Sequence, residues 1–589
     1  MENEYIKIGK VLPDFVKNFN TEDDGFSVSF KLLDTVASPD LSPTVSKDIK
    51  VAVTVQNKMN GSTCSMPILI TRIPVETHLG YKLNGTLYAM MGIDKRACGW
   101  YISEQNRGGT KSLTLEFVPH SGMRFIFLER NSKIQVFFNL KNYKARVHLG
   151  VFLKALTGKT HQELISALGS HNRLILQSLQ NEQPRDFCLE KSLLAMGANP
   201  ANLPEGIRFK ELKRRLTDKY SLNPGNAATR TARQVKFEER AEGTILVKSV
   251  ANYQRGTILT KEILRKIDED SSITTLFVKC EGKVFELKKY KIPEDKPFSE
   301  EELFTLINMY AVTLDGFGLA DNSLELTNRR TQSYKDSVCE VVETALNRII
   351  YSVKDFFQSN GENADLASFK FPTFHPDDYI NNLKTSLEVQ NSEPINGISL
   401  ASKQDKIISD MSGRGGENFV TVKDTERYLY DPLAQPESKK IGFVHYKTLD
   451  TRLSPEGELT GTFAKVTNGV ADSSAPVYLN AYTIKNSIIA PWDADLTQPQ
   501  VVCLYGSRTI TVPVQDVQYQ EWSPFGEFSL STALIPFVQF SDGKRNTMGG
   551  NFTKQAVQTI HRERPLVSTG VCGYYDLGVV RCKEILERY

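Results

Sequence analysis

Residues from about 334 to 357 carry an apolar stripe at helical spacing over roughly six turns. Its members are Tyr334, Val338, Val341, Val342, Ala345, Ile349, Val353 and Phe356. Because residues three or four apart lie on one face of a helix, the pattern predicts a long helix with one buried face. A stripe of this kind is typical of core packing rather than of a cofactor site.

Period-two alternation, which is typical of half-buried strands, occurs on both sides of this helix. It appears at residues 50–55, 113–118 and 125–128, and returns between 441 and 514, where turns such as Ser454-Pro-Glu-Gly457 interrupt it. Residues 1–150 are therefore predicted to be strand-rich, and residues 441–589 to be β-rich. With the long helix, these patterns predict a multidomain α+β fold.

The region between these parts, residues 151–390, is predicted to be mainly helical, with a small β piece near 243–290. Two capping-box patterns, Thr160-His-Gln-Glu163 and Ser299-Glu-Glu-Glu302, predict helix starts. Residues 208–240 are the most basic stretch, but acidic residues are interspersed, so a solvated helix face is preferred over a nucleic-acid contact. From about residue 395 the chain is predicted to be loop-rich.

Length and charge narrow the function classes. The chain has 589 residues, with 72 Lys and Arg against 69 Asp and Glu, a net charge of +3. This length predicts roughly four domains. The balance excludes a protein whose whole surface is basic, so a nucleic-acid partner would need positive charge gathered in particular grooves.

The sparse cysteines predict a reducing compartment. The pattern of apolar residues predicts neither a signal peptide nor a transmembrane helix. The eight cysteines are scattered without a CxxC pair, which argues against a structural zinc site. No apolar h-region follows Met1, and no apolar run approaches the ~20 residues that a transmembrane helix needs.

Common enzyme signatures are absent from the sequence. It contains no GxxxxGK[ST] loop, HExxH, EF-hand loop or GxSxG elbow, and no Asp-rich metal motif. The chain therefore does not resemble a self-sufficient enzyme.

Two segments remain as candidate sites. The first, Ser412-Gly-Arg-Gly-Gly416, carries Arg414 and by itself is interpreted as a surface loop. The second runs from Asp542 to Gln555 and places Lys544 and Arg545 before a Gly-Gly pair, which lets a backbone or a ligand approach closely. A guanidinium beside exposed amides suits a phosphate, although a turn with a surface arginine is the commoner outcome.

Residues 517–570 change that balance, because they resemble the β subunit of multisubunit DNA-dependent RNA polymerase just past its N-terminal half. The similarity runs without a gap through Val517-Gln-Tyr519, Ser523, Ser529, Leu534-Ile-Pro-Phe537, Asp542, Arg545, Met548-Gly-x-Asn551, Gln555-Ala-Val557, Pro565 and Thr569-Gly570. Weaker similarities occur upstream in the same order, at Leu83-Asn-Gly-Thr86, Phe152-Leu-Lys-Ala-Leu156, Leu324-Glu-Leu-Thr-Asn-Arg-Arg330 and Gln435-Pro-Glu437.

This resemblance implies the N-terminal half of a split β subunit, most similar to those of giant bacteriophages. Residues 1–150 would form a protrusion-like part, 151–390 a lobe-like region, 391–440 a fork-loop and hybrid-facing segment, and 441–589 a part ending in the NTP- and RNA-facing segment. The fragment would be inactive alone. Its implied partners are a C-terminal β fragment, β′ or its fragments, a promoter-specificity subunit, the DNA template, nascent RNA and NTPs, and no membrane.

The resemblance also implies roles for individual residues. Arg545 would contact the triphosphate and act in catalysis, with Lys544, which stands where bacterial forms have Asn, beside it and Asp542 orienting their turn. The residues implied to contact nucleic acid are Asn551, Lys554, Gln555, Pro436, Glu437, Lys440 and Arg414. The assembled enzyme would use Mg²⁺ held by other subunits, and no zinc is expected in this chain.

The implied location is the cytoplasm of a bacterial host cell, with packaging in the virion left open. The alternative function is a non-catalytic virion protein or a nucleic-acid-binding protein that keeps the β fold.

Overall fold

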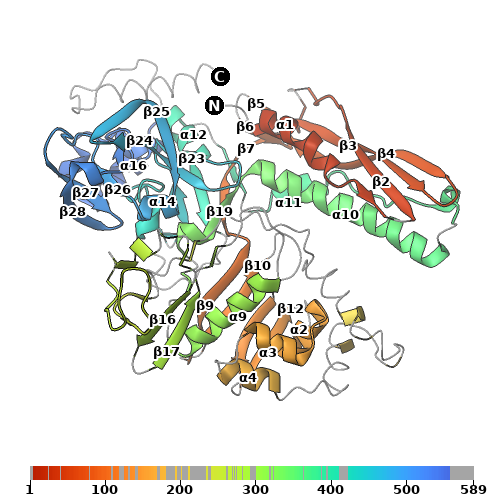
Figure 1. The fold of residues 1–589 in the computed structure, drawn as a ribbon. Coiled ribbons are helices and arrows are strands. Elements are labelled where there is room, and N and C mark those ends of the chain that lie inside the picture. Colours follow the sequence, from red (N-terminus) through yellow and green to blue (C-terminus); the bar gives the residue numbers. More distant parts are fainter. Residues whose placement is uncertain are drawn as a thin grey trace. The chain divides into compact units, whose positions relative to one another are not determined.

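Figure 1 shows the fold in a computed structural model of the chain. The structure describes residues 4–23, 25–39, 42–77, 80–107, 110–118, 125–130, 133–139, 144–168, 173–180, 193–194, 201, 208, 210–212, 234–235, 241–260, 263–264, 266–267, 270, 272–273, 275–280, 283–288, 290–291, 300–316, 320–322, 324–361, 364–386, 388–392, 395–409, 422–438 and 440–557. The chain divides into two compact units. Unit 1 comprises Met1–Lys95 with Leu324–Tyr589, and unit 2 comprises Arg96–Ser323.

Unit 1 begins with a four-stranded antiparallel sheet in the order β1 (Thr21–Glu22), β2 (Phe26–Leu33), β3 (Ser46–Asn57) and β4 (Thr63–Pro74). Val51, Val53 and Val55 on β3 are fully buried, as period-two alternation predicts. Helix α1 (Glu4–Lys17), which the strand-rich prediction for this region missed, packs against the same core.

The predicted long helix is α10 (Tyr334–Asn360), which lies along this sheet (Figure 1). Its apolar stripe is buried at Val338, Val342 and Ile349, so the prediction of a core-packing helix is confirmed. Ser333 and Asp336 form a capping box at its start. A cap of this kind satisfies backbone donors that the helix itself leaves open.

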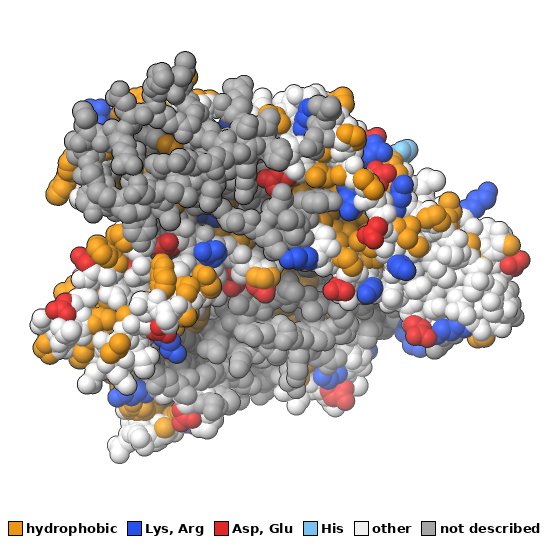
Figure 2. All heavy atoms as spheres, turned by 90° about the horizontal axis from the view of Figure 1, so that it is seen from above, with side chains coloured by type: hydrophobic (Ala, Val, Ile, Leu, Met, Phe, Trp, Pro, Cys, Tyr) orange, Lys and Arg blue, Asp and Glu red, His pale blue; other side chains and the backbone are white. Residues whose placement is uncertain are grey.

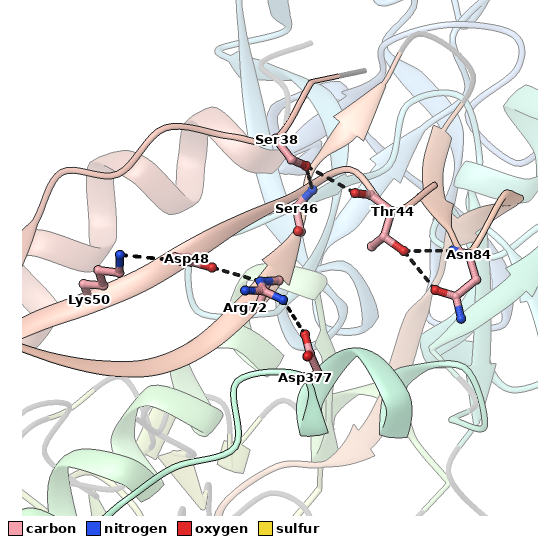
Figure 3. Close-up of polar contacts among 8 residues, drawn as sticks. All are labelled: Ser38, Thr44, Ser46, Asp48, Lys50, Arg72, Asn84 and Asp377. Carbon is pink, nitrogen blue, oxygen red and sulfur yellow. Dashed lines mark hydrogen bonds and ion pairs between the residues drawn. The ribbon is translucent and has the colours of Figure 1, made fainter. Parts of the chain in front are cut away.

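Arg72 fixes the short helix α11 (Asp378–Leu383) to the end of this sheet, as Figure 3 shows. Its Nε donates to Asp48 Oδ1 at 2.9 Å and its Nη1 to Asp377 Oδ1 at 2.7 Å, while its backbone N–H donates to Pro376 O at 2.9 Å. The guanidinium therefore has a carboxylate on each side.

Two small sheets in unit 1 join segments that are far apart in the sequence. One has the order β20, β7, β6, β5, and the other has the order β19, β8, β21, β22. The bounds are β5 (Glu76–Thr77), β6 (Gly80–Leu83), β7 (Thr86–Met90), β8 (Gly92–Arg96), β19 (Arg329–Gln332), β20 (Val389–Asn391), β21 (Lys406–Ser409) and β22 (Val444–Tyr446). Because β8 and β21 pair in parallel, Asp94 lies opposite Ser409.

The C-terminal part of unit 1 contains a seven-stranded sheet, which confirms the β-rich prediction for residues 441–514. Its strands are β23 (Arg452–Leu453), β24 (Leu459–Thr467), β29 (Tyr519–Glu521), β26 (Ile488–Ala490), β27 (Gln500–Tyr505) and β28 (Arg508–Pro513), with β25 (Val470–Asn480) paired to β24. The predicted turn at Ser454–Gly457 is present, with Gly457 in the left-handed region at φ 79° and its N–H donating to Ser454 O.

Unit 2 is built on an antiparallel sheet in the order β13 (Lys144–His148), β12 (Lys133–Asn139), β11 (Phe125–Arg130), β10 (Thr110–Val118) and β9 (Gly99–Arg107). Its core contains helices α2 (Leu149–Thr157), α3 (His161–Leu168), α4 (Arg173–Gln180) and α9 (Glu300–Leu314). The predicted capping box is present, since Thr160 N–H donates to Glu163 Oε2 at 2.7 Å. The sequence boundary at 150 divides strands from helices, whereas the compact unit starts at 96 and keeps both together.

Smaller strand groups also belong to unit 2. They are β15 (Ile245–Leu246), β16 (Thr275–Cys280) and β17 (Lys283–Lys288) in one sheet, and β14 (Gln234–Val235) with β18 (Tyr290–Lys291) in another. The first of these is the predicted small β piece, and it has its own apolar core. The chain therefore has a mixed, multidomain α+β fold, as predicted. Within the described residues, no helix combines the length and apolar character needed to cross a bilayer.

Candidate functional site

Helix α16 (Gly543–Gln555) carries six of the ten predicted site residues, counting Asp542 as its N-cap. The sequence pattern predicts a turn here, and that prediction is wrong, because the segment forms a helix. Asp542 Oδ1 accepts the backbone N–H of Arg545 at 3.0 Å, so the acidic residue starts a helix. This hydrogen bond is the contact through which Asp542 would orient the backbone that carries Arg545.

Lys544 and Arg545 lie in the first turn of α16, and both are exposed. The contact recorded for the guanidinium is with Met548, at 3.9 Å between Nη1 and Sδ. Within the described ranges, neither cation forms an ion pair with a carboxylate. The N-terminus of a helix favours negative charge, so two unneutralised cations there add to an anion-attracting end.

The Gly549-Gly550 pair was expected to let a backbone or a ligand approach closely, and its neighbour in the structure is another segment of the same chain. A Cβ on Gly549 would lie 3.6 Å from Ile535 Cδ1, and one on Gly550 would lie 3.8 Å from Ser531 Oγ. These are ordinary packing distances against the segment that holds helix α15 (Leu530–Ala533). The glycines therefore bring two parts of the same chain together, rather than leaving space for a ligand.

The segment with Pro436 and Glu437 lies beside α16, so the structure brings two predicted groups together. Asn551 Nδ2 donates to Glu437 Oε1 at 3.2 Å, and Thr547 Oγ1 donates to Leu433 O at 2.8 Å. Glu437 is exposed and Pro436 half-buried.

The remaining predicted residues are less closely joined. Gln555 and Lys440 are exposed, and neither side chain contacts another predicted residue among those that the structure describes. Arg414 lies outside the described residues.

Lys554 has a more enclosed setting than its neighbours on α16. Its Nζ lies 4.0 Å from the centre of the Tyr446 ring, a cation–π contact. Burial, together with the charge of Lys406, lowers the pKa of Lys554 to about 8, although Asp431 acts in the opposite direction.

Asp431 was not predicted from the sequence. It is a fully buried carboxylate whose hydrogen bonds hold together segments next to α16. Its Oδ2 accepts the N–H of Ser529 at 2.8 Å and the hydroxyl at 2.6 Å, while its Oδ1 accepts the amides of Leu433 and Ala434. The start of α15 is thereby tied to the 431–434 turn that contacts α16. The signal available in the sequence was the Asp-Pro pair, which favours turns.

Asn396 was missed as well, and it joins two helices. Its Oδ1 accepts the N–H of Ser399 at 2.7 Å, which caps the start of helix α12 (Gly397–Gln404). Its Nδ2 donates to Thr553 O at 2.9 Å and to Ala556 O at 2.6 Å, at the C-terminal end of α16. One amide thus satisfies a donor of one helix and acceptors of another.

Replacing Asn396 with Asp is expected to loosen the end of α16 selectively. The carboxylate keeps the acceptor for Ser399, but it cannot donate and it repels the carbonyl dipoles of α16. We expect hydrogen exchange at residues 551–557 to accelerate by about tenfold, which corresponds to the loss of ~1.4 kcal/mol. Exchange in α12 should be unchanged, and equal acceleration in both helices would contradict the assigned roles.

A cleft of about 670 Å³ lies elsewhere in unit 1, around the Arg72 contacts drawn in Figure 3. Its lining includes one guanidinium, Arg72, and two carboxylates, Asp48 and Asp377, both paired with it. Since the cation is already neutralised, this cleft does not suit a phosphate.

On the face seen in Figure 2, the Lys and Arg side chains of the described residues are interspersed with Asp and Glu, as in the near-neutral composition. Among the residues placed by the structure, no group of three or more His, Cys, Asp or Glu side chains could hold a metal ion.

Comparison with known proteins gives a consistent likeness. No family model matches the chain. It is 25% identical over 560 residues to the DNA-directed RNA polymerase subunit beta of Cyanidium caldarium, covering 90% of this chain and 46% of that protein. The same subunit of Synechococcus sp. strain RCC307 is 24% identical over 550 residues, covering 90% of this chain and 45% of the relative.

A third relative aligns with a larger share of this chain. The DNA-directed RNA polymerase subunit beta of Staphylococcus saprophyticus is 22% identical over 619 residues, covering 95% of this chain and 51% of the relative. The chain thus spans about half the length of the curated relatives it matches. The likeness first seen at residues 517–570 extends over nine-tenths of the sequence.

Proposed function

We propose that the chain is the N-terminal half of a β-like subunit of a multisubunit DNA-directed RNA polymerase. The observation that carries this proposal is the similarity to β subunits over 90% of the chain. The site is compatible with the role, because α16 presents Lys544 and Arg545 without carboxylate partners among the described residues. Nucleotidyl transfer is then the reaction to which the chain contributes.

In this proposal, Arg545 acts on the triphosphate of the incoming NTP. Charge builds up on the pyrophosphate as the bond to the α-phosphorus breaks, and a nearby guanidinium stabilises that charge. The Asp542 cap fixes the backbone of Arg545, so the guanidinium needs less reordering when substrate binds. Lys544 adds a second cation at the same helix end.

The other predicted residues are proposed to face the RNA and its hybrid with template DNA. Asn551 and Glu437, which contact each other, would form one continuous surface with Pro436. Lys554, Gln555 and Lys440 would supply donors and charge along the backbone phosphates, a mode of contact that does not read sequence. Arg414 is proposed to belong to the fork region.

The rest of the enzyme is proposed to come from other polypeptides. The remaining half of the β-like subunit, β′ or its fragments, and a promoter-specificity subunit would complete the channel for DNA, RNA and NTPs. Mg²⁺ would be held by ligands on those chains, where it supplies Lewis-acid stabilisation of the phosphoryl oxygens. A giant-bacteriophage origin, with action in the host cytoplasm or packaging in the virion, belongs to the same proposal.

Affinity purification of the tagged chain from its native source tests this assignment. We expect co-purification of a polypeptide similar to the C-terminal half of β and of β′-like chains, identified by mass spectrometry. Recovery of the chain with capsid proteins and without any β′-like polypeptide would instead support the non-catalytic virion alternative.

A further inference from the structure

A second cationic group lies beside α16, around Tyr446 on β22. Lys406 is the cross-strand partner of Tyr446, and directly opposed residues of an antiparallel pair project from the same face. Lys554 reaches the same place from α16, with its Nζ 4.0 Å from the centre of the Tyr446 ring. Two lysines that are far apart in the sequence therefore flank one aromatic ring.

Neither lysine has a carboxylate partner among the residues that the structure describes. Lys406 Nζ donates to Gln390 Oε1 at 2.7 Å, a neutral acceptor, and Lys554 rests on the ring. Both side chains are half-buried. The neighbouring Lys447, in contrast, forms an ion pair with Asp405 at 3.4 Å. A half-buried cation without a counter-ion loses hydration that no acid replaces, so this arrangement suits an incoming anion.

The titratable groups around the two ammonium groups are mostly basic. Burial lowers the pKa of Lys406 to about 8, and Lys440 and Lys403 add to that effect. Burial and the charge of Lys406 lower the pKa of Lys554 to about 8, and Asp431 is the acid among the described residues that raises it. Asp431 is already engaged by Ser529 and by the 431–434 turn, and burial keeps the Tyr446 phenol neutral by raising its pKa.

We propose that Lys406, Lys554 and Tyr446 form a phosphate-binding subsite, which takes a backbone phosphate of single-stranded RNA. This rests on the proposed function and adds Lys406 to the residues that contact nucleic acid. The two ammonium groups bind the phosphate oxygens, and the ring keeps Lys554 in place. Gln390 holds the Lys406 amine at the other side of the subsite.

Fluorescence anisotropy of the purified full-length chain with a labelled 12-nucleotide RNA measures the contribution of Lys406. Removing one phosphate contact from a single strand lowers the salt slope by about 0.7, so Lys406→Gln should weaken binding about fivefold at ~0.1 M salt. Lys406→Arg should retain the affinity, because the positive charge is kept. Lys447→Gln is the matched control and should leave the affinity unchanged.

The thermal midpoint of Lys406→Gln separates binding from folding. Because the variant removes a half-buried, unpaired charge, the midpoint should stay the same or rise. Equal RNA affinity and salt slope for Lys406→Gln and the wild type would overturn the subsite. An equal loss of RNA affinity in Lys447→Gln would also overturn the subsite. A fall in the thermal midpoint of Lys406→Gln that accounts for its weaker RNA binding would do so as well.

Proton uptake gives a second readout. Burial lowers the pKa of Lys406 and of Lys554 to about 8 in the absence of RNA, and a bound phosphate raises both toward the ordinary value of 10.5. RNA binding should therefore take up protons at pH 8–9, measured by calorimetry in two buffers of different ionisation enthalpy. Affinity should fall as the pH rises from 7 to 9, and this dependence should weaken in Lys406→Gln.

Competition with pyrophosphate identifies the source of the phosphate. RNA binding that millimolar pyrophosphate does not displace supports a backbone contact. Displacement together with tight pyrophosphate binding would overturn the RNA assignment in favour of a free anion. If the assembled enzyme makes RNA normally with Lys406→Gln and RNA affinity is also unchanged, the subsite fails while the proposed polymerase role stands.

Discussion

Replacing Arg545 with alanine is expected to slow nucleotide addition by the assembled enzyme by about 10²–10³-fold, the usual cost of losing one preorganised group that stabilises transition-state charge. The guanidinium is exposed, lies in the first turn of α16 and has no carboxylate partner among the described residues. It contributes nothing evident to the core, so its loss should not unfold the chain.

Single-nucleotide addition in a stalled elongation complex, measured against NTP concentration, distinguishes this role from a structural one. Arg545→Lys should recover part of the rate, because it keeps the charge but loses the forked geometry. Asp542→Ala should cause a smaller loss, since it removes a helix cap worth about 1 kcal/mol rather than the cation. If Arg545→Ala changes neither the rate nor the NTP dependence, the assignment is wrong.

Replacing Arg329 with methionine is expected to destabilise unit 1 by about 3–5 kcal/mol, because it leaves a buried carboxylate without its cation. The side chains of Arg329 and Asp94 are 3% and 6% exposed, and Arg329 Nε donates to Asp94 Oδ2. Arg329 Nη2 also donates to Ser409 Oγ at 3.0 Å, so the guanidinium joins β8 and β21 where they pair in parallel.

Hydrogen exchange at the amides of β8 and β21 measures this change without assuming a single unfolding transition. The double variant Arg329→Met with Asp94→Leu should be more stable than Arg329→Met alone, because both charges are removed from the core. Arg72→Met is a control, since its partly exposed ion pairs should contribute about 1 kcal/mol or less. An equal loss in the two arginine variants would contradict the distinction.

Local patterns predicted the elements whose burial is set by a regular period. The stripe of α10 and the alternation on β3 were found because one face of each is buried against the same core. The capping box at Thr160 was found because its two residues are three apart and interact locally.

The candidate site was predicted in part, and its misses have physical causes. The segment from Asp542 to Gln555 has few apolar residues and two adjacent glycines, which favour a turn, yet packing of Gly549 and Gly550 against Ile535 and Ser531 accommodates a helix. Tertiary contact here overrides a weak propensity.

Asn396 and Lys406 could not be recognised from local spacing. Asn396 donates to carbonyl groups that lie 157 and 160 positions further along the chain. Strand pairing places Lys406 opposite Tyr446, and Lys554 reaches the Tyr446 ring from a helix far along the chain. Single polar residues carry no period, so their roles appear only when the fold brings their partners together.

Template-dependent RNA synthesis by the complex purified through this chain tests the central proposal most directly. We predict incorporation of labelled NTPs into RNA that requires a DNA template and Mg²⁺, is lost when the chain is omitted from reassembly, and falls steeply with Arg545→Ala. A complex that contains β′-like chains yet makes RNA equally well without this chain, or makes none on any template, would contradict it.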